Sequence, residues 1–137
     1  MNSGLILATT FLLGFLSACS SKTPEIRPFS EPEKKEFFVV PGEDEKVDLE
    51  IIKRGQVLVA YSDCYQCHKE ADKAKGPSFS DIARRYPMRE AIIDMLARKV
   101  ISGGFGAWGY PVMSAHPKVS VEDARAMVTY VLSVEGK

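Results

Sequence analysis

A cluster of two cysteines and a histidine places the strongest constraint on how this chain can fold. Residues 64–68 read Cys-Tyr-Gln-Cys-His, so the two thiols are separated by two residues and the imidazole follows at once. When such a motif forms a helical turn, both sulfur atoms face one side, and the side chain of the next residue can point to that side as well. The chain has three cysteines in all, and an odd number requires at least one use other than disulfide pairing.

This spacing is typical of covalent haem attachment. Cys64 and Cys67 would add across two vinyl groups at one edge of the porphyrin, and His68 would bind the iron through an imidazole nitrogen. Two other sites use the same residue types. A redox dithiol is expected beside a strand–helix unit, which the sequence does not indicate. A zinc site with four ligands would have only His116 and the distant Cys19 to complete it. We therefore predict one haem c, with iron as its metal.

The first residues of the chain indicate export. Residues 4–16 form an apolar run without charge, shorter than the roughly 20 residues of a membrane-spanning helix and suited to the core of a secretory signal. Residues 16–19 read Leu-Ser-Ala-Cys and resemble the bacterial lipoprotein box. The resemblance implies a signal peptide over residues 1–18 and lipidation of Cys19. Residues 1–18 contain no Lys or Arg, which departs from the pattern and leaves open an uncleaved anchor or a signal cut elsewhere.

Residues 19–46 are expected to form a flexible tether between this lipid anchor and a folded domain over residues 47–137. The segment holds four prolines and many charges and shows no helical or strand period. Its one short apolar run, residues 37–40, is a candidate for docking onto the domain.

The remaining residues predict an all-α domain. Glycines at 103 and 104 would end one helix, and Ser120 with Asp123 resembles a capping box at the start of another. No strand pattern competes. A domain of about 90 residues with long loops has a thin core, which a large apolar cofactor would complete. Because 18 basic residues balance 18 acidic ones, no bulk charge favours nucleic acid as a partner. Helices are expected over residues 47–61, 79–86, 89–101 and 121–135.

A haem that only carries electrons needs a second axial ligand, and the sequence offers five candidates. Met95 and Met127 fall on the apolar stripes of helices, where methionine usually fills core gaps. Met88 lies close to a helix start. Met113 lies in an irregular loop, residues 103–117, which is long enough to reach the opposite haem face. His116 in the same loop remains a rival ligand.

Several motifs together resemble the class I cytochromes c, in particular the small bacterial cytochrome c551/c552 group. The resemblance extends over roughly residues 47–134. It rests on Gly55, residues 64–68, Gly76-Pro77-Ser78-Phe79, Asp81-Ile82-Ala83, Leu96-Ala97, Gly106-Ala107-Trp108-Gly109, Met113 and Tyr130-Val131-Leu132-Ser133.

The resemblance implies a cytochrome c fold, about four helices wrapped around one covalent haem. It implies iron ligation by His68 and Met113, a bond from the other imidazole N–H to the carbonyl of Pro77, and Trp108 as a haem-propionate donor. It also implies that the first and last helices cross at a contact between Gly55 and Tyr130. The family usually has proline directly before the ligand methionine, whereas here the nearest preceding proline stands two positions earlier.

Basic residues near this site have expected roles as well. Lys99 or Arg98 would neutralise a propionate by the same resemblance, and Arg84 and Arg85 are expected to be solvated helix charges.

The resemblance also implies a function. It predicts an electron carrier and not an enzyme, which passes single electrons between redox proteins such as a respiratory oxidase, reductase or dehydrogenase. With lipid on Cys19, the domain would work on the periplasmic side of a bacterial membrane. Two alternatives stay open. One is a haem-based ligand sensor in which the bond to Met113 is labile, and the other is a structural lipoprotein whose cysteines bind a metal or pair.

Overall fold

A computed structural model describes residues 38–134, and the predicted signal peptide and Cys19 lie outside that range. The four predicted helices are confirmed, each within two residues of its expected bounds. No helix within residues 38–134 is long and apolar enough to cross a bilayer. In chain order the elements are α1 (Leu49–Tyr61), the 3-10 helix η1 (Asp63–Gln66), α2 (Phe79–Arg85), α3 (Glu90–Ser102), β1 (Gly104–Gly106), β2 (Gly109–Met113) and α4 (Val121–Ser133).

Side-chain caps start α1, α2 and α4, and the sequence indicates the one at Ser120. The Ser120 hydroxyl accepts a hydrogen bond from the backbone N–H of Asp123 at 3.0 Å and donates to its carboxylate at 2.9 Å, as the capping pattern predicts. These contacts, led by the bond to Ser120, lower the pKa of Asp123. Ser78 caps α2 by accepting from the N–H of Asp81 at 3.0 Å. Helix α3 ends at Gly103, whose φ of 70° favours glycine.

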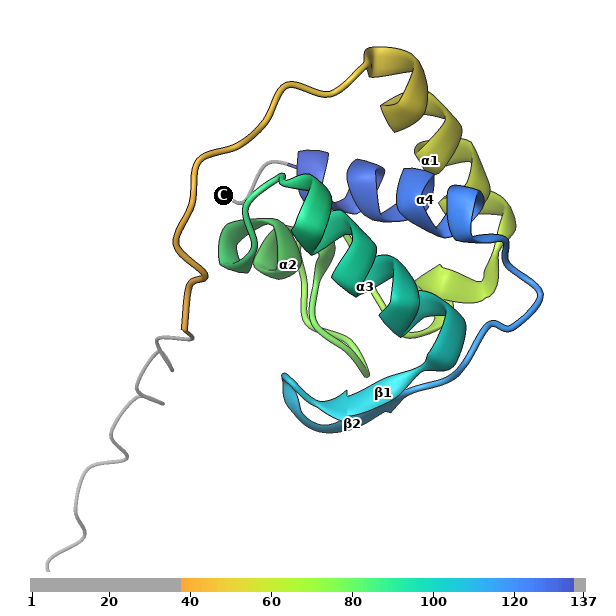
Figure 1. The fold of residues 1–137 in the computed structure, drawn as a ribbon. Coiled ribbons are helices and arrows are strands. Elements are labelled where there is room, and N and C mark those ends of the chain that lie inside the picture. The colour runs from red at the N-terminus through yellow and green to blue at the C-terminus, as the bar shows by residue number, and fades with distance from the viewer. Residues whose placement is uncertain (1–37, 135–137) are drawn as a thin grey trace, which may run out of the picture. The chain divides into compact units, whose positions relative to one another are not determined.

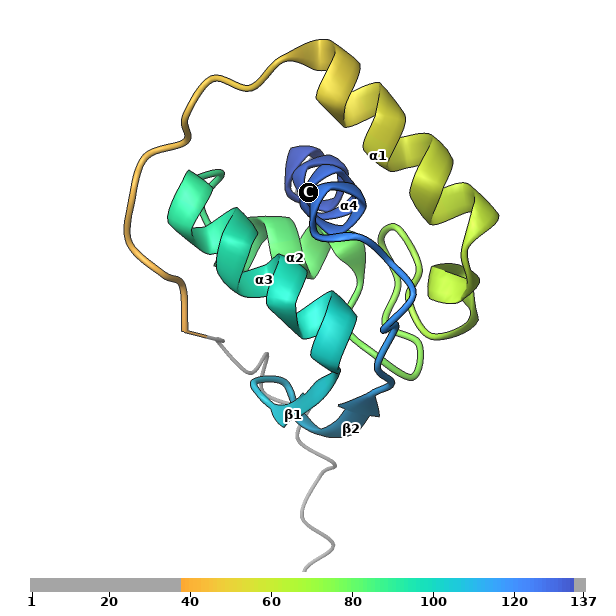
Figure 2. The same ribbon diagram turned by 45° about the vertical axis from the view of Figure 1, so that its right-hand side comes forward.

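Helix α4 lies at the centre of the domain, between α1 and α3 (Figures 1 and 2). Helix α1 crosses α4 at Gly55, where a Cβ atom would lie 1.9 Å from the carbonyl oxygen of Ala126. Only glycine allows this approach. The contact of Gly55 with Tyr130, implied by the resemblance, is present in the same place. The buried residues of α4 are Ala124, Ala126, Met127, Val128, Thr129, Tyr130 and Leu132.

The core consists of two clusters on either side of α4. Met127 is buried in the cluster that contains Phe79, and Met88 is buried in the cluster that contains Tyr86. Met95 is partly buried and packs against the cluster of Met88. The packing role predicted for Met95 and Met127 is therefore confirmed. The first cluster contains Val59, Phe79, Met127 and Tyr130, and the second contains Tyr86, Met88, Ile93, Ala97, Ala124, Val128 and Leu132.

The expectation that no strand forms is wrong for residues 104–113. Strands β1 and β2 form an antiparallel hairpin in which Gly104 pairs with Met113 and Gly106 with Gly109. Gly106 and Gly109 have φ values of 90° and 89°, which glycine adopts readily at a turn. Strands this short and rich in glycine carry no alternation of apolar and polar residues, so the sequence offers no period to detect.

Residues 38–46, here called the strap, run along the connection between α2 and α3 (Figure 1). The N–H of Val40 donates to the carbonyl of Arg85 at 2.8 Å, and that of Glu45 donates to the carbonyl of Met88 at 2.7 Å. The carboxylate of Asp44 accepts from the N–H of Met88 at 2.6 Å. This part of the expected tether therefore holds a defined position against the end of α2 and the connection to α3.

The apolar run expected to dock onto the domain does so in part. Val40 packs against the core, while the side chains of Phe38 and Val39 are exposed. Phe37 lies outside the described residues.

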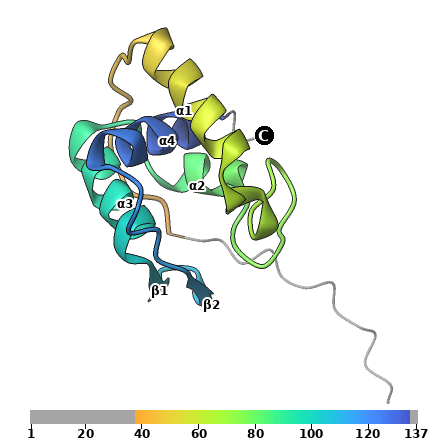
Figure 3. The same cartoon turned by 90° about the vertical axis from the view of Figure 1, so that its right-hand side faces the viewer.

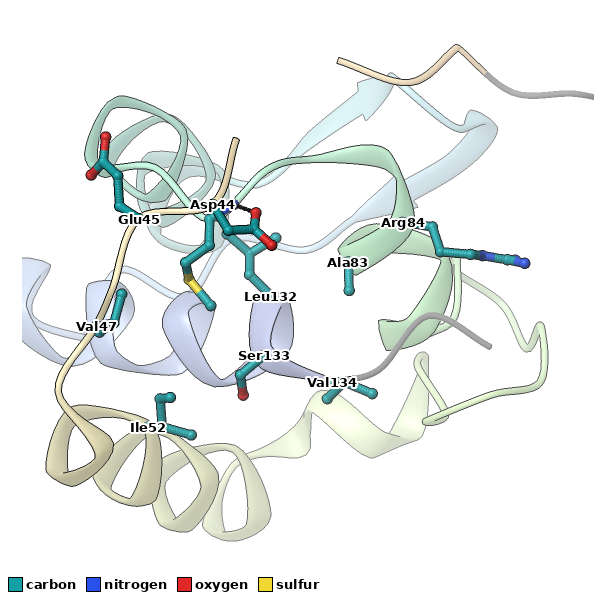
Figure 4. Close-up of a pocket in the computed structure, with 10 residues that line it drawn as sticks. Asp44, Glu45, Val47, Ile52, Ala83, Arg84, Leu132, Ser133 and Val134 are labelled. Carbon is teal, nitrogen blue, oxygen red and sulfur yellow. Dashed lines mark hydrogen bonds between the residues drawn. The ribbon is translucent and has the colours of Figure 1, made fainter. Parts of the chain in front are cut away.

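A pocket of about 490 Å³ lies between the strap and the end of α4 (Figure 4). None of the residues predicted to bind haem lines it, so it is separate from the predicted cofactor site. Its lining includes Asp44, Glu45, Ile52, Arg84, Met88 and Val134.

Replacing Gly55 with alanine is expected to destabilise the holoprotein by roughly 3 kcal/mol, because the new methyl group would overlap the backbone of Ala126. Urea unfolding followed by circular dichroism measures the loss. The control is Q56A at the neighbouring exposed position, expected within about 0.5 kcal/mol of the parent. Equal stability of G55A and Q56A would contradict the close crossing.

Candidate haem site

The 3-10 helix η1 carries the first half of the predicted site. It begins two residues after α1 ends, and its turn is closed by bonds from the N–H groups of Cys67 and His68 to the carbonyl of Cys64, at 3.2 and 3.0 Å. The predicted helical turn is thus confirmed. Both cysteines are free thiols, with Cys64 partly buried and Cys67 exposed. Burial raises the pKa of the Cys64 thiol, and the charge of Asp63 acts in the same direction.

The imidazole of His68 is oriented by the loop that follows. Its Nδ1 lies 2.7 Å from the carbonyl oxygen of Pro77. A carbonyl only accepts, so we assign the proton to Nδ1, which leaves the lone pair on Nε2 available for a metal. The ring of Phe79 stacks on the imidazole with centroids 5.6 Å apart. The contact that the resemblance implied for Pro77 is therefore present.

Backbone hydrogen bonds hold this loop in place. The N–H of Gly76 donates to the carbonyl of Cys67 at 2.8 Å, and that of Phe79 donates to the carbonyl of Lys69 at 2.9 Å. A Cβ atom on Gly76 would lie 2.8 Å from Cε1 of His68. Glycine at this position is therefore required for the imidazole to lie against the loop.

The β1–β2 hairpin carries the second half of the site. It lies below α3, while η1 and its following loop lie below the end of α1, both on the same side of α4 (Figure 3). Met113 is partly buried at the end of β2. Trp108 lies at the hairpin turn and packs edge-on against Tyr86, with ring centroids 6.4 Å apart.

Arg85 belongs to this half of the site, contrary to the expectation that it is a solvated helix charge. Its Nη1 donates to the carbonyl of Ala107 at 2.6 Å, and its guanidinium carbon lies 4.5 Å from the centroid of Trp108. Its Nε is buried without a hydrogen-bond partner. The partners are more than 20 positions away in sequence, so no local pattern signals the contact. Arg84 is exposed, as expected.

The rival ligand His116 is engaged elsewhere. Its Nε2 lies 3.0 Å from a carboxylate oxygen of Asp63, and its Nδ1 lies 3.2 Å from the carbonyl oxygen of Val100. Residues 38–134 contain no group of three or more His, Cys, Asp or Glu side chains that could hold a metal ion.

The residues present fit a covalent haem. Two free thiols lie on one turn, the imidazole has its Nδ1 satisfied and its Nε2 available, and Gly76 gives that ring the room it needs. Cysteine, histidine and methionine are the protein groups that attach and ligate haem c. A mostly helical domain with this donor set defines the chain as a c-type haem protein.

Comparison with known proteins agrees. Residues 52–135 match the family model of cytochrome c, so the chain belongs to the cytochrome c family. It is 36% identical over 78 residues to cytochrome c-551 of Allochromatium vinosum, covering 57% of this chain and 83% of that protein. It is 35% identical over 80 residues to cytochrome c-552 of Hydrogenobacter thermophilus, covering 57% and 79%. The crystal structure of Nitrosomonas europaea cytochrome c552 superimposes with a TM-score of 0.55 at 31% identity, covering 58% of this chain and 99% of that one.

These matches confirm the predicted class and fold. The chain is a small bacterial class I cytochrome c with one covalent haem c, which members of the family bind through a Cys-x-x-Cys-His motif such as residues 64–68. The family is one of electron carriers.

Replacing Gly76 with alanine is expected to push the imidazole of His68 off the carbonyl of Pro77. Losing that bond makes the ligand less basic, which should raise the reduction potential and lower the fraction of protein that holds haem. Redox titration and haem absorbance per protein measure both. A71S, at an exposed position of the same loop, is the control. A G76A protein with the parent's potential would refute the role assigned to this glycine.

Proposed function

We propose that this cytochrome carries single electrons between redox proteins, with its iron held by His68 and Met113. The bond from His68 Nδ1 to Pro77 carries the proposal, because it fixes the tautomer that can bind iron through Nε2. Both ring nitrogens of His116 face other oxygen atoms, which supports Met113 as the second ligand. When bound, the haem supplies one-electron exchange at iron.

The protein residues determine how that exchange proceeds. A thioether from Met113 favours ferrous iron and raises the potential above that of a site with two histidines. The Pro77 carbonyl strengthens His68 as a donor and holds its ring plane. With His68 and Met113 both holding the iron, no position would remain there for a substrate, so we propose an electron carrier and not an enzyme.

The partners we propose are a respiratory oxidase, reductase or dehydrogenase that docks beside the hairpin. Three large apolar side chains of the hairpin, Phe105, Tyr110 and Val112, are at least 73% exposed. Residues 98–118 also contain three basic and no acidic residues. The exposed apolar side chains and the basic residues around them fit a small, transient contact with a redox protein whose docking surface has an acidic rim.

We further propose that the domain is lipid-anchored through Cys19 on the periplasmic side of a bacterial membrane. The apolar leader and the Leu-Ser-Ala-Cys sequence at residues 16–19 support this anchor. The residues between Cys19 and the strap span at most about 60 Å when extended, which would keep the haem within reach of membrane-bound partners.

The variant M113A tests the second ligand. Without the thioether, the iron should become high-spin and bind cyanide or carbon monoxide rapidly, and the potential should fall by on the order of 0.1 V or more, within the roughly 0.8 V that axial ligands span. Optical spectra and redox titration measure these changes. H116A should keep the parent spectrum. An unchanged spectrum in M113A would transfer the ligand role to another residue, and rapid cyanide binding to the parent would favour a ligand sensor.

The variant C19S tests the anchor. In a bacterial host that matures c-type cytochromes, the parent should fractionate with membranes and incorporate labelled fatty acid, and C19S should do neither. S21A, two residues along, should behave as the parent. Retention of C19S in the membrane fraction would instead assign the anchor to the apolar leader.

A further inference from the structure

We propose that Arg85 is a positioning residue that holds the β1–β2 hairpin, and with it Met113, in the closed position against the domain. The proposal rests on the proposed role of Met113 as an iron ligand. Arg85 is the last residue of α2, and the hairpin follows α3, so the contact joins two parts of the domain that the chain does not connect directly.

The hairpin needs such a contact because little in its own sequence stabilises it. Strands β1 and β2 pair only with each other within the described residues, and a two-stranded hairpin is marginally stable by itself. Gly106 and Gly109 add backbone freedom at its turn. Val112 and Ser114, which flank Met113, impose none of the φ restriction that proline would.

Arg85 contacts the turn of the hairpin in two ways. The bond from Nη1 to the Ala107 carbonyl is 2.6 Å long, and the positive charge of its donor strengthens it. The guanidinium also stacks over the Trp108 ring at 4.5 Å, where a planar cation is attracted to the aromatic face. The two contacts act on consecutive residues, so they hold both the position and the orientation of the turn.

The burial of one atom of Arg85, its Nε, distinguishes this contact from an accidental surface encounter, although the side chain as a whole is only partly buried. Its Nε lies out of solvent without a hydrogen-bond partner, although a guanidinium on an exposed helix end would normally keep all its N–H groups in water. The other contacts of the side chain must offset that loss of solvation. A buried group without a hydrogen-bond partner needs an explanation, and the two contacts of Arg85 with the hairpin supply one.

The backbone of Arg85 is itself held by the strap. Its carbonyl accepts from the N–H of Val40 at 2.8 Å, and the next residue, Tyr86, is buried and packs against Trp108. The strap precedes residues 52–135, the part matched by the family model. A segment added to the matched domain thus fixes the helix end from which Arg85 reaches the hairpin.

The test compares R85Q with R84Q in the full-length holoprotein. Cyanide can bind ferric iron only after the methionine leaves, so its binding rate reports how often the hairpin opens. R85Q should bind cyanide about tenfold faster or more, since it removes a charge-assisted bond and a stacking contact. It should also weaken the long-wavelength absorption band of sulfur-ligated ferric haem. R84Q alters the neighbouring exposed arginine, which pairs with Asp81, and should stay within about twofold of the parent.

A conservative variant separates position from charge. R85K keeps the positive charge but lacks the planar fork, so its cyanide rate should lie between those of the parent and R85Q. In a W108L background, R85Q should have a smaller effect than in the parent, because one of its two contacts is already lost. Should R85Q fail to accumulate with haem, R85K carries the test alone.

The proposal would be overturned if R85Q or R85K bound cyanide at the rate of the parent protein, or if R85Q and R84Q bound it at equal rates. A failure of the proposed function would look different, because M113A would then keep the parent spectrum. If M113A loses the sulfur ligand while R85Q behaves as the parent, only the positioning role is rejected.

Discussion

The close crossing of α1 and α4 at Gly55 determines where the rest of the haem site lies. Because α1 approaches the backbone of Ala126, its last turn ends beside the centre of the domain, and η1 follows within two residues. Helix η1 and the loop after it, whose residues include the two cysteines and His68, therefore lie on one side of α4 (Figure 3). A side chain at Gly55 would move this whole segment, since helices pack as rigid bodies and interiors have few voids to absorb a shift.

The two halves of the site are restrained in different ways. The half that carries His68 is held mainly by backbone hydrogen bonds, from Gly76 to Cys67 and from Phe79 to Lys69, and by the carbonyl of Pro77. The half that carries Met113 is a short hairpin that continues directly from α3. Its turn contacts the rest of the domain through the side chains of Arg85 and Trp108, and just after it the N–H of His116 donates to the carbonyls of α3 at 3.1 Å. A backbone ladder tolerates most substitutions of side chains, whereas a hairpin held by an arginine and a tryptophan depends on their identity.

This difference fits a carrier of electrons. If His68 and Met113 both bind the iron, as proposed, rigid ligands on its two sides would keep its geometry similar in both oxidation states and would favour rapid electron exchange. The strap brings a further restraint that lies outside the part shared with the cytochrome c family model. The strap stabilises the connection between α2 and α3. It also bonds the backbone of Arg85, whose side chain contacts the hairpin that carries Met113.

The sequence by itself determined the haem motif, the four helices and the cap at Ser120, because each depends on residues a few positions apart. The resemblance to class I cytochromes c supplied the contact of His68 with Pro77, which spacing alone would not predict. Only the tertiary structure decided four other features: the hairpin, the contacts of the strap, the contacts of Arg85 with the hairpin turn, and the contact of His116 with Asp63. These contacts join residues that lie 22 to 53 positions apart, or strands too short to show a period, so their free energy comes from packing that no local pattern records.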